Sequence, residues 1–207
     1  MRMNVLRQLD ITVVGGLLHH GSGPATTNLL DPDFPERLAQ HAATAAARYP
    51  FITSWTPVNE PLTTARFSCL YGYWYPHLRD TNAFLRALVN QCRAVLLSMR
   101  AIRLSVPDAQ LIQTEDLGRI FSTSPLEPQA AYENERRWLS LDLLCGRVDR
   151  AHSWRSRFES AGVSARHLDE LATGEGIPSV IGVNYYVTSD RFLDHRLELY
   201  PADMRGD

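Results

Sequence analysis

The 207-residue sequence predicts an α/β fold in which about four parallel βα units follow one another. Four short apolar runs alternate with longer segments whose apolar residues recur at helical spacing. This order is typical of parallel sheets with right-handed crossovers. Hydrophobic residues make up 44% and charged residues 21% of the chain, so there is enough apolar material for a buried core. No linker or repeat interrupts the pattern, and we expect a single domain over residues 1–207.

The expected strands are nearly continuous in apolar character, as strands covered on both faces are. They lie at residues 11–18, 51–56, 110–115 and 180–186. Helices are expected at 33–49, from 81 to about 105, from 129 to about 150, and at 165–172. Asp33 is a candidate N-cap of the first helix, and Asp80 or Asn82 of the second. In the third helix, Trp138, Leu141 and Leu144 are expected on the buried side.

Charge and hydropathy exclude several classes of partner. The 21 Lys and Arg residues nearly balance the 23 Asp and Glu residues, and the net charge of −2 gives no basis for binding nucleic acid or an anionic membrane surface. No apolar stretch reaches the ~20 residues of a membrane-spanning helix, and the N-terminus lacks a signal-peptide core. Cys69, Cys92 and Cys145 have no metal-ligand spacing, which predicts structural thiols, a cytoplasmic location, and neither a metal nor another cofactor.

Polar residues stand at the C-terminal ends of all four expected strands. They are His19 and His20, Asn59 and Glu60, Glu115 and Asp116, and Asn184 and Tyr186. In a β/α barrel the active site is assembled from these ends, so the pattern indicates a site here. Turns at strand ends are also polar for structural reasons, and that is the alternative explanation.

Glu60 is the first candidate for chemistry. It precedes Pro61, and a residue before proline is held in extended geometry, so its carboxylate is expected to project from the end of the second strand. Asn59 adds an amide that can both donate and accept, which suits a hydroxyl-rich ligand. The structural alternative is an exposed Glu in a proline-bounded loop.

Three segments carry a resemblance to a known family. Residues 55–61, WTPVNEP, resemble the W-x-T-x-N-E-P motif of glycoside hydrolase family 1, the β-glucosidase and β-galactosidase family. Residues 16–20, GLLHH, resemble that family's strand ending in a sugar-binding His, and residues 181–186, IGVNYY, are similar to its G-x-N-Y-Y strand. The resemblance runs from about Leu9 to Tyr186 and implies the third to sixth strands of a (β/α)8 TIM-type barrel.

What the resemblance implies is hydrolysis of β-glucosides or β-galactosides, with a β-linked sugar as the partner. Glu60 would be the general acid/base, and Asn59 would hydrogen-bond the sugar's 2-hydroxyl. The other substrate-binding positions would be His19, His20, Trp55, Asn184 and Tyr186. Tyr186 would also orient the catalytic nucleophile.

The sequence departs from the family at three points. Pro57 stands where the family has Thr, and His20 where it has Trp. The I-T-E-N-G motif that carries the nucleophile is absent after Tyr186. Glu115 is the candidate second carboxylate: about 5 Å from Glu60 would mean retention and roughly 6.5–9.5 Å inversion. The structural alternative for Glu115 is an acid at a strand end whose carboxylate is hydrogen-bonded by a helix N-terminus or paired with an arginine. Asp190 is expected to be an ordinary helix cap.

Two functional hypotheses follow. In the first, the chain is a glycosidase whose second carboxylate is either a substitute within the chain or the contribution of another chain. Four βα units leave two open sheet edges, which predicts a homo-oligomer. In the second, the chain is a catalytically incomplete carbohydrate-binding protein or a truncated glycosidase fragment. The aromatic residues Tyr71, Tyr73, Trp74 and Tyr75 fit either hypothesis, as sugar-stacking platforms or as packing.

Overall fold

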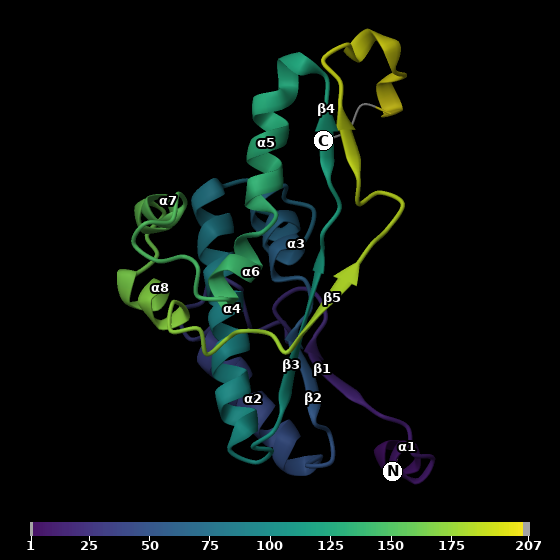
Figure 1. Ribbon diagram of the computed structural model, residues 1–207, viewed down its shortest axis with the longest axis vertical. Coiled ribbons are helices and arrows are strands. Elements are labelled where there is room, and N and C mark those ends of the chain that lie inside the picture. Colours follow the sequence, from purple (N-terminus) through teal and green to yellow (C-terminus); the bar gives the residue numbers. More distant parts are fainter. Residues whose placement is uncertain (1, 205–207) are drawn as a thin grey trace. The chain divides into compact units, whose positions relative to one another are not determined.

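The computed structural model describes residues 2–204, and its main feature is a four-stranded sheet of order β1-β2-β3-β5 (Figure 1). The strands are β1 (Val14–Leu18), β2 (Ser54–Val58), β3 (Gln110–Asp116) and β5 (Val180–Asn184). β1 pairs with β2 and β2 with β3 in parallel, with Ser54 opposite both Val14 and Gln110. The predicted partial barrel of parallel βα units is confirmed.

The chain divides into two compact units. The first comprises residues up to Glu115 together with Ser140–Gly182, and the second Asp116–Leu139 together with the residues from Val183 onward. The expected single domain over residues 1–207 stays a prediction.

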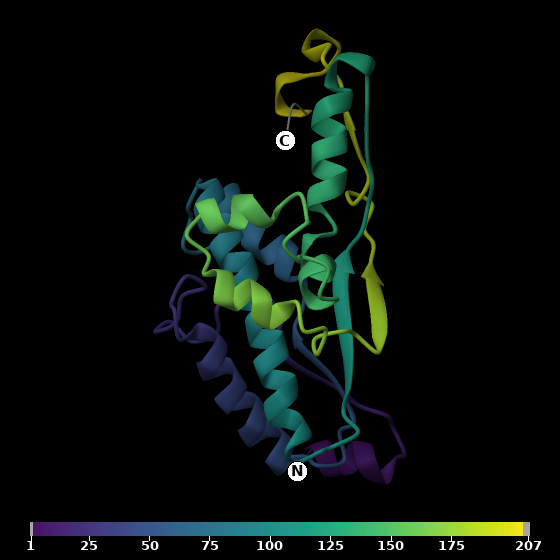
Figure 2. The same cartoon turned by 60° about the vertical axis from the view of Figure 1, so that its left-hand side comes forward.

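Two long helices form the core of the first unit. α2 (Phe34–Arg48) and α4 (Thr81–Arg103) lie side by side on one face of the sheet (Figure 2). α4 begins where it was predicted, because the Asp80 carboxylate accepts a hydrogen bond from the Ala83 N–H. Asp33 makes no such cap bond for α2 and instead pairs with Arg37 at 2.6 Å. The apolar face of α4 is buried throughout, which gives the strand ends a rigid support.

Shorter helices complete the first unit. They are α1 (Arg2–Gln8), α3 (Pro61–Ala65), α7 (Arg155–Ser160) and α8 (Ala165–Leu171), with a π-helical turn at Arg66–Leu70. The helix expected from 129 to about 150 is instead two helices, α5 (Glu127–Arg136) and α6 (Leu139–Leu144). Trp138 lies in the turn between them and is 49% exposed, so its predicted burial was wrong, whereas Leu141 and Leu144 are buried.

The second unit is built on a pair of short parallel strands, β4 (Ile120–Ser122) and β6 (Arg191–Leu193). The Asn134 side chain on α5 holds the helix to β4, because it bonds both the N–H and the C=O of Ile120. Three 3-10 turns occur at Ser124–Leu126, Leu197–Leu199 and Ala202–Met204. Asp190 caps no helix, contrary to prediction: it precedes β6 and accepts hydrogen bonds from the Arg119 N–H and the Tyr185 hydroxyl.

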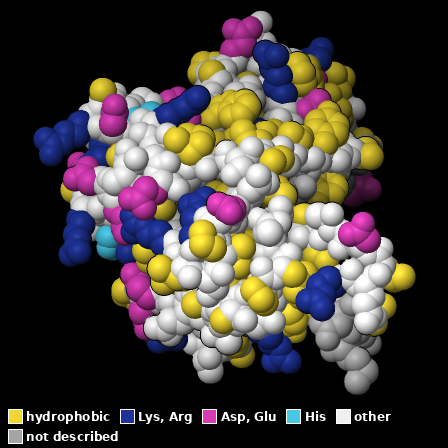
Figure 3. All heavy atoms as spheres, turned by 60° about the horizontal axis from the view of Figure 1, so that its bottom comes forward, with side chains coloured by type: hydrophobic (Ala, Val, Ile, Leu, Met, Phe, Trp, Pro, Cys, Tyr) yellow, Lys and Arg dark blue, Asp and Glu magenta, His cyan; other side chains and the backbone are white. Residues whose placement is uncertain are grey.

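The surface matches the balanced composition. On the face shown in Figure 3, basic and acidic side chains lie interspersed around apolar ones. Among the described residues, no helix combines the length and apolar character that crossing a bilayer requires.

The contact between Gly15 and Trp55 gives a prediction about stability. A Cβ at Gly15 would lie 2.5 Å from Cε3 of the Trp55 ring, so Gly15→Ala is expected to lower the free energy of unfolding. Overpacking of this kind costs about 1–3 kcal/mol, which urea unfolding measures. Gly16→Ala is the matched control, since a Cβ there meets nothing within 4 Å. Equal losses in the two variants would contradict this packing.

Candidate active site

Glu60 is held in an unusual backbone conformation at the end of β2. Its φ and ψ are 46° and 63°, so the extended geometry predicted before Pro61 was wrong. The Glu60 N–H donates to the Thr114 carbonyl at 3.1 Å, and the Thr64 N–H donates to the Glu60 carbonyl at 3.0 Å. A non-glycine residue in this region costs of order 1–3 kcal/mol and persists where its surroundings over-determine it, often at functional sites.

Burial separates Glu60 from an ordinary loop acid. Its side chain is 2% exposed, which rules out the alternative of an exposed Glu in a proline-bounded loop. Burying a carboxylate costs free energy, so a buried Glu at a strand end indicates a structural or functional role.

Asn59 is fixed by contacts to both neighbouring strands. Its N–H donates to the Leu18 carbonyl at 2.9 Å, and its side-chain oxygen accepts from the Thr114 hydroxyl at 2.8 Å. The hydroxyl of Thr114 therefore sets the orientation of the Asn59 amide.

His19 and Asn59 are brought together on the open side of the sheet. Both line a hollow of about 330 Å³ whose remaining wall comes from β1, β2 and β3. The other lining residues are Val14, Gly16, Leu17, Leu18, Thr56 and Thr114. The predicted juxtaposition of these two strand ends is thus present in the first unit.

His20 connects this site to a second hollow. Its Nδ1 lies 3.1 Å from the Thr64 hydroxyl, and its ring packs between His19 and Trp74, with centroids 4.4 Å and 4.8 Å away. Burial lowers the pKa of His20, and the neighbouring His19 lowers it further. The imidazole is therefore biased toward the neutral form, which can both donate and accept a hydrogen bond.

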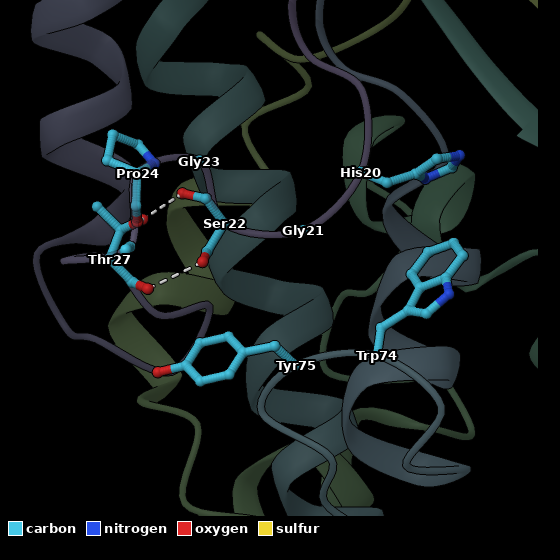
Figure 4. Close-up of a pocket in the computed structure, with 9 residues that line it drawn as sticks. His20, Gly21, Ser22, Gly23, Pro24, Thr27, Trp74 and Tyr75 are labelled. Carbon is cyan, nitrogen blue, oxygen red and sulfur yellow. Dashed lines mark hydrogen bonds between the residues drawn. The ribbon is translucent and has the colours of Figure 1, made fainter.

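The second hollow, of about 440 Å³, lies between the loop after β1 and the segment that carries Trp74 and Tyr75 (Figure 4). His20, Trp74 and Tyr75 form its aromatic part. The opposite wall is stiffened by Ser22 and Thr27, each of whose hydroxyls donates to the other's carbonyl. Trp74 also packs edge-on against Phe67, at 4.8 Å between ring centroids, so its role in packing is established.

Several predicted site residues do not line the two hollows: Glu60 and Glu115 are buried, and three more lie elsewhere. Trp55 is in the core, where its indole N–H donates to the Ile52 carbonyl at 3.0 Å, and it does not line either hollow. Asn184 and Tyr186 belong to the second unit, where the Tyr186 N–H donates to the Ser189 hydroxyl. Neither Asn184 nor Tyr186 lines the two hollows of the first unit.

Glu115 is wholly buried beside the turn that carries Glu60. Its Oε1 accepts a hydrogen bond from the Leu62 N–H at 3.0 Å. Burial raises the pKa of Glu115 to about 8, and the charge of Glu60 adds a smaller increase. This geometry matches the alternative weighed for Glu115, a strand-end acid satisfied by a helix N-terminus.

The raised pKa of Glu115 predicts a pH dependence of stability. Its folded value of about 8 lies above its usual value of 4.5, so its stabilising effect is full below pH 4.5 and is lost as the pH rises through 8. In Glu115→Gln, the free energy of unfolding should therefore fall less between pH 5 and pH 8 than in the wild type. Urea unfolding across this range measures both slopes, and parallel curves would contradict the assignment.

Sequence reasoning missed two residues that shape the site. Gln91, a fully buried residue of α4, donates through Nε2 to the Pro61 carbonyl at 3.1 Å. Thr114 holds both Asn59 and Glu60. The available signal for Gln91 was a polar side chain on the apolar face of a predicted helix, directly before Cys92.

Cysteine and metal chemistry add little to this region. Cys69 and Cys92 are buried free thiols, and burial raises the pKa of Cys69 to about 11. Within residues 2–204, no three His, Cys, Asp or Glu side chains are grouped as a metal site requires.

The chain folds as a partial TIM-type barrel, with a buried carboxylate and an amide at one strand end. No family model and no curated relative matches the chain. Solved structures do match. The family 1 β-glucosidase from Thermotoga maritima has a TM-score of 0.72 at 17% identity, over 93% of this chain and 44% of that one.

Two complexes of the Thermotoga maritima β-glucosidase give the same result. The one with cyclophellitol has a TM-score of 0.76 at 18% identity, covering 95% of this chain and 45% of that one. The one with deoxynojirimycin has a TM-score of 0.73 at 17% identity, covering 93% and 44%. This chain thus has the fold of part of a family 1 β-glucosidase, and it spans less than half the length of those chains.

Proposed function

We propose that this chain carries the acid/base half of a β-glycosidase site, with Glu60 as the general acid/base acting on β-glucosides or β-galactosides. The observation that carries the proposal is the buried Glu60, held at φ 46° beside Asn59 at a strand end. The fold shared with a β-glucosidase supports the proposal, because active sites of TIM barrels lie at the C-terminal ends of the strands.

In the proposed reaction, Glu60 protonates the glycosidic oxygen as the bond to the sugar breaks, and later accepts a proton from the attacking water. Asn59, oriented by Thr114, bonds the 2-hydroxyl of the sugar, and His19 bonds hydroxyls at the rim of the hollow. His20 lies next to His19 and is proposed as a further substrate-binding residue. Proton transfer of this kind needs no cofactor.

The second carboxylate is proposed to come from outside residues 1–207. Glu115 Oε1 is taken by the Leu62 N–H, and its side chain is fully buried, which disfavours it as the nucleophile. β1 and β5 are the outer strands of the sheet, and open edges of this kind are a liability unless covered. We expect a homo-oligomer in which a second chain covers an edge and completes the site. Light scattering at micromolar concentration tests this, and a monodisperse monomer would contradict it.

Turnover of nitrophenyl β-glucoside and β-galactoside tests the proposed function. The wild type should release nitrophenol above background, and Glu60→Gln should be slower. Glu175→Gln is the matched control, because Glu175 is an exposed acid of the first unit paired with Arg100. It should retain the wild-type rate. If Glu60→Gln and the wild type are equally fast, the mechanism is wrong.

The second candidate function is sugar binding without hydrolysis. It is favoured by the hollow that His19 and Asn59 line, and by the complete burial of Glu115, which disfavours Glu115 as a nucleophile. Calorimetric binding of a β-glucoside, together with rates at background for both wild type and Glu60→Gln, would support this candidate over the first.

A further inference from the structure

The start of α3 is capped in an unusual way. Pro61 is the first residue of the helix and has no N–H, so Leu62 presents the first N–H that needs an acceptor. Where a helix has a side-chain cap, the side chain of the N-cap residue accepts from the second or third helical N–H. Glu60 is the N-cap residue of α3, yet its side chain makes no cap bond.

Glu115 supplies this bond from another element. Its Oε1, on β3, accepts from the Leu62 N–H at 3.0 Å across 53 positions of sequence. Gln91, on α4, donates to the Pro61 carbonyl at 3.1 Å. The Pro61 carbonyl and the Leu62 N–H belong to one peptide group. Both of its polar atoms are therefore hydrogen-bonded by fully buried side chains, the carbonyl by Gln91 and the N–H by Glu115.

This grip restrains the residue that precedes it. With the Pro61–Leu62 peptide fixed and the Glu60 N–H bonded to Thr114, the backbone on both sides of Glu60 is held. A left-handed conformation that costs free energy needs such restraint to stay populated.

We propose that Glu115 is a positioning residue for Glu60: it caps α3 in place of Glu60, and with Gln91 it locks the peptide that keeps Glu60 in its left-handed conformation. The inference rests on the proposed acid/base role of Glu60 and deepens it. Glu115 touches no substrate; it acts through the Glu60 turn.

The test compares two substitutions at Glu115. Glu115→Gln keeps an acceptor for Leu62, and Glu115→Met removes it at similar volume. Glu115→Met should lower kcat for a phenyl β-glucoside about tenfold or more with KM nearly unchanged, because small displacements of a reacting group are costly. Glu115→Gln should restore kcat to within about threefold. Gln91→Met, which frees the other end of the same peptide, should reproduce the loss if Glu115→Met does not fold.

A structural readout separates failure of this inference from failure of the proposed function. Amide hydrogen exchange of Leu62 should be faster in Glu115→Met and unchanged in Glu115→Gln. Leu111→Ala, a core substitution on the same strand, is the control for general destabilisation and should leave kcat of the folded protein unchanged. If wild type shows no turnover, the proposed function fails, and the exchange rates alone decide whether Glu115 holds the turn. Unchanged Leu62 exchange in Glu115→Met, or an equal loss of kcat in both Glu115 variants, would overturn the inference.

Discussion

Replacing Glu60 by Gln is expected to lower kcat/KM for an alkyl β-glucoside by about 10²–10⁴-fold, the usual contribution of a general acid or base. An alkoxide is a poor leaving group and needs the proton that the Glu60 carboxyl would supply. Nitrophenolate leaves with little protonation, so the loss for nitrophenyl β-glucoside should be clearly smaller. Initial rates of wild type and variant on the two glucosides measure the difference.

The comparison between leaving groups isolates proton transfer from other effects. Glu175→Gln removes an exposed acid of the same unit and should change neither rate. A Glu60→Gln variant that loses the same factor on both glucosides would show damage to binding or folding rather than to proton donation, and would contradict the assigned role.

Removing the amide of Asn59 is expected to have the second largest effect. Hydrogen bonds to the 2-hydroxyl strengthen in the transition state and supply several kcal/mol, so Asn59→Ala should lower kcat/KM for a β-glucoside by about 10²-fold or more. A 2-deoxy-β-glucoside lacks this hydroxyl and should be hydrolysed equally by the wild type and by Asn59→Ala. Steady-state kinetics on the substrate pair give the measurement.

Thr114→Val provides a graded control for Asn59. It keeps the Asn59 amide but removes the hydroxyl that donates to its oxygen at 2.8 Å. The kcat/KM of Thr114→Val on the β-glucoside should lie between the values of the wild type and of Asn59→Ala. Equal losses for Asn59→Ala on the glucoside and the 2-deoxyglucoside would exclude a contact to the 2-hydroxyl.

The sheet could be predicted from the sequence because its strands are local apolar runs of strand length. The second strand begins three residues later than expected and continues through Pro57 to Val58. The strand itself was predicted correctly, but its ends were not. One helix was expected from 129 to about 150 because the apolar spacing continues on both sides of Trp138. The structure has two helices there, with a turn at Trp138. The short elements of the second unit, such as β4 and β6, carry too few residues for a periodic signal.

The site was predictable only in part, and for a physical reason. Asn59 and Glu60 follow one strand in a local motif, so their place at its end could be inferred. The conformation of Glu60 depends on Thr114, Gln91 and Glu115, which come from other elements 31 or more positions away. Local preference before Pro61 favoured extended backbone, and these tertiary contacts override it.

The pH dependence of kcat/KM tests most directly the central claim that Glu60 transfers the proton. A general acid must be protonated to act, so the wild-type rate on a phenyl β-glucoside should fall on the alkaline side of its optimum. Glu60→Gln has no proton to lose at this position, and its much lower rate should stay level over the same range. An alkaline fall of the same shape and midpoint in both proteins would contradict the assignment of Glu60 as the acid.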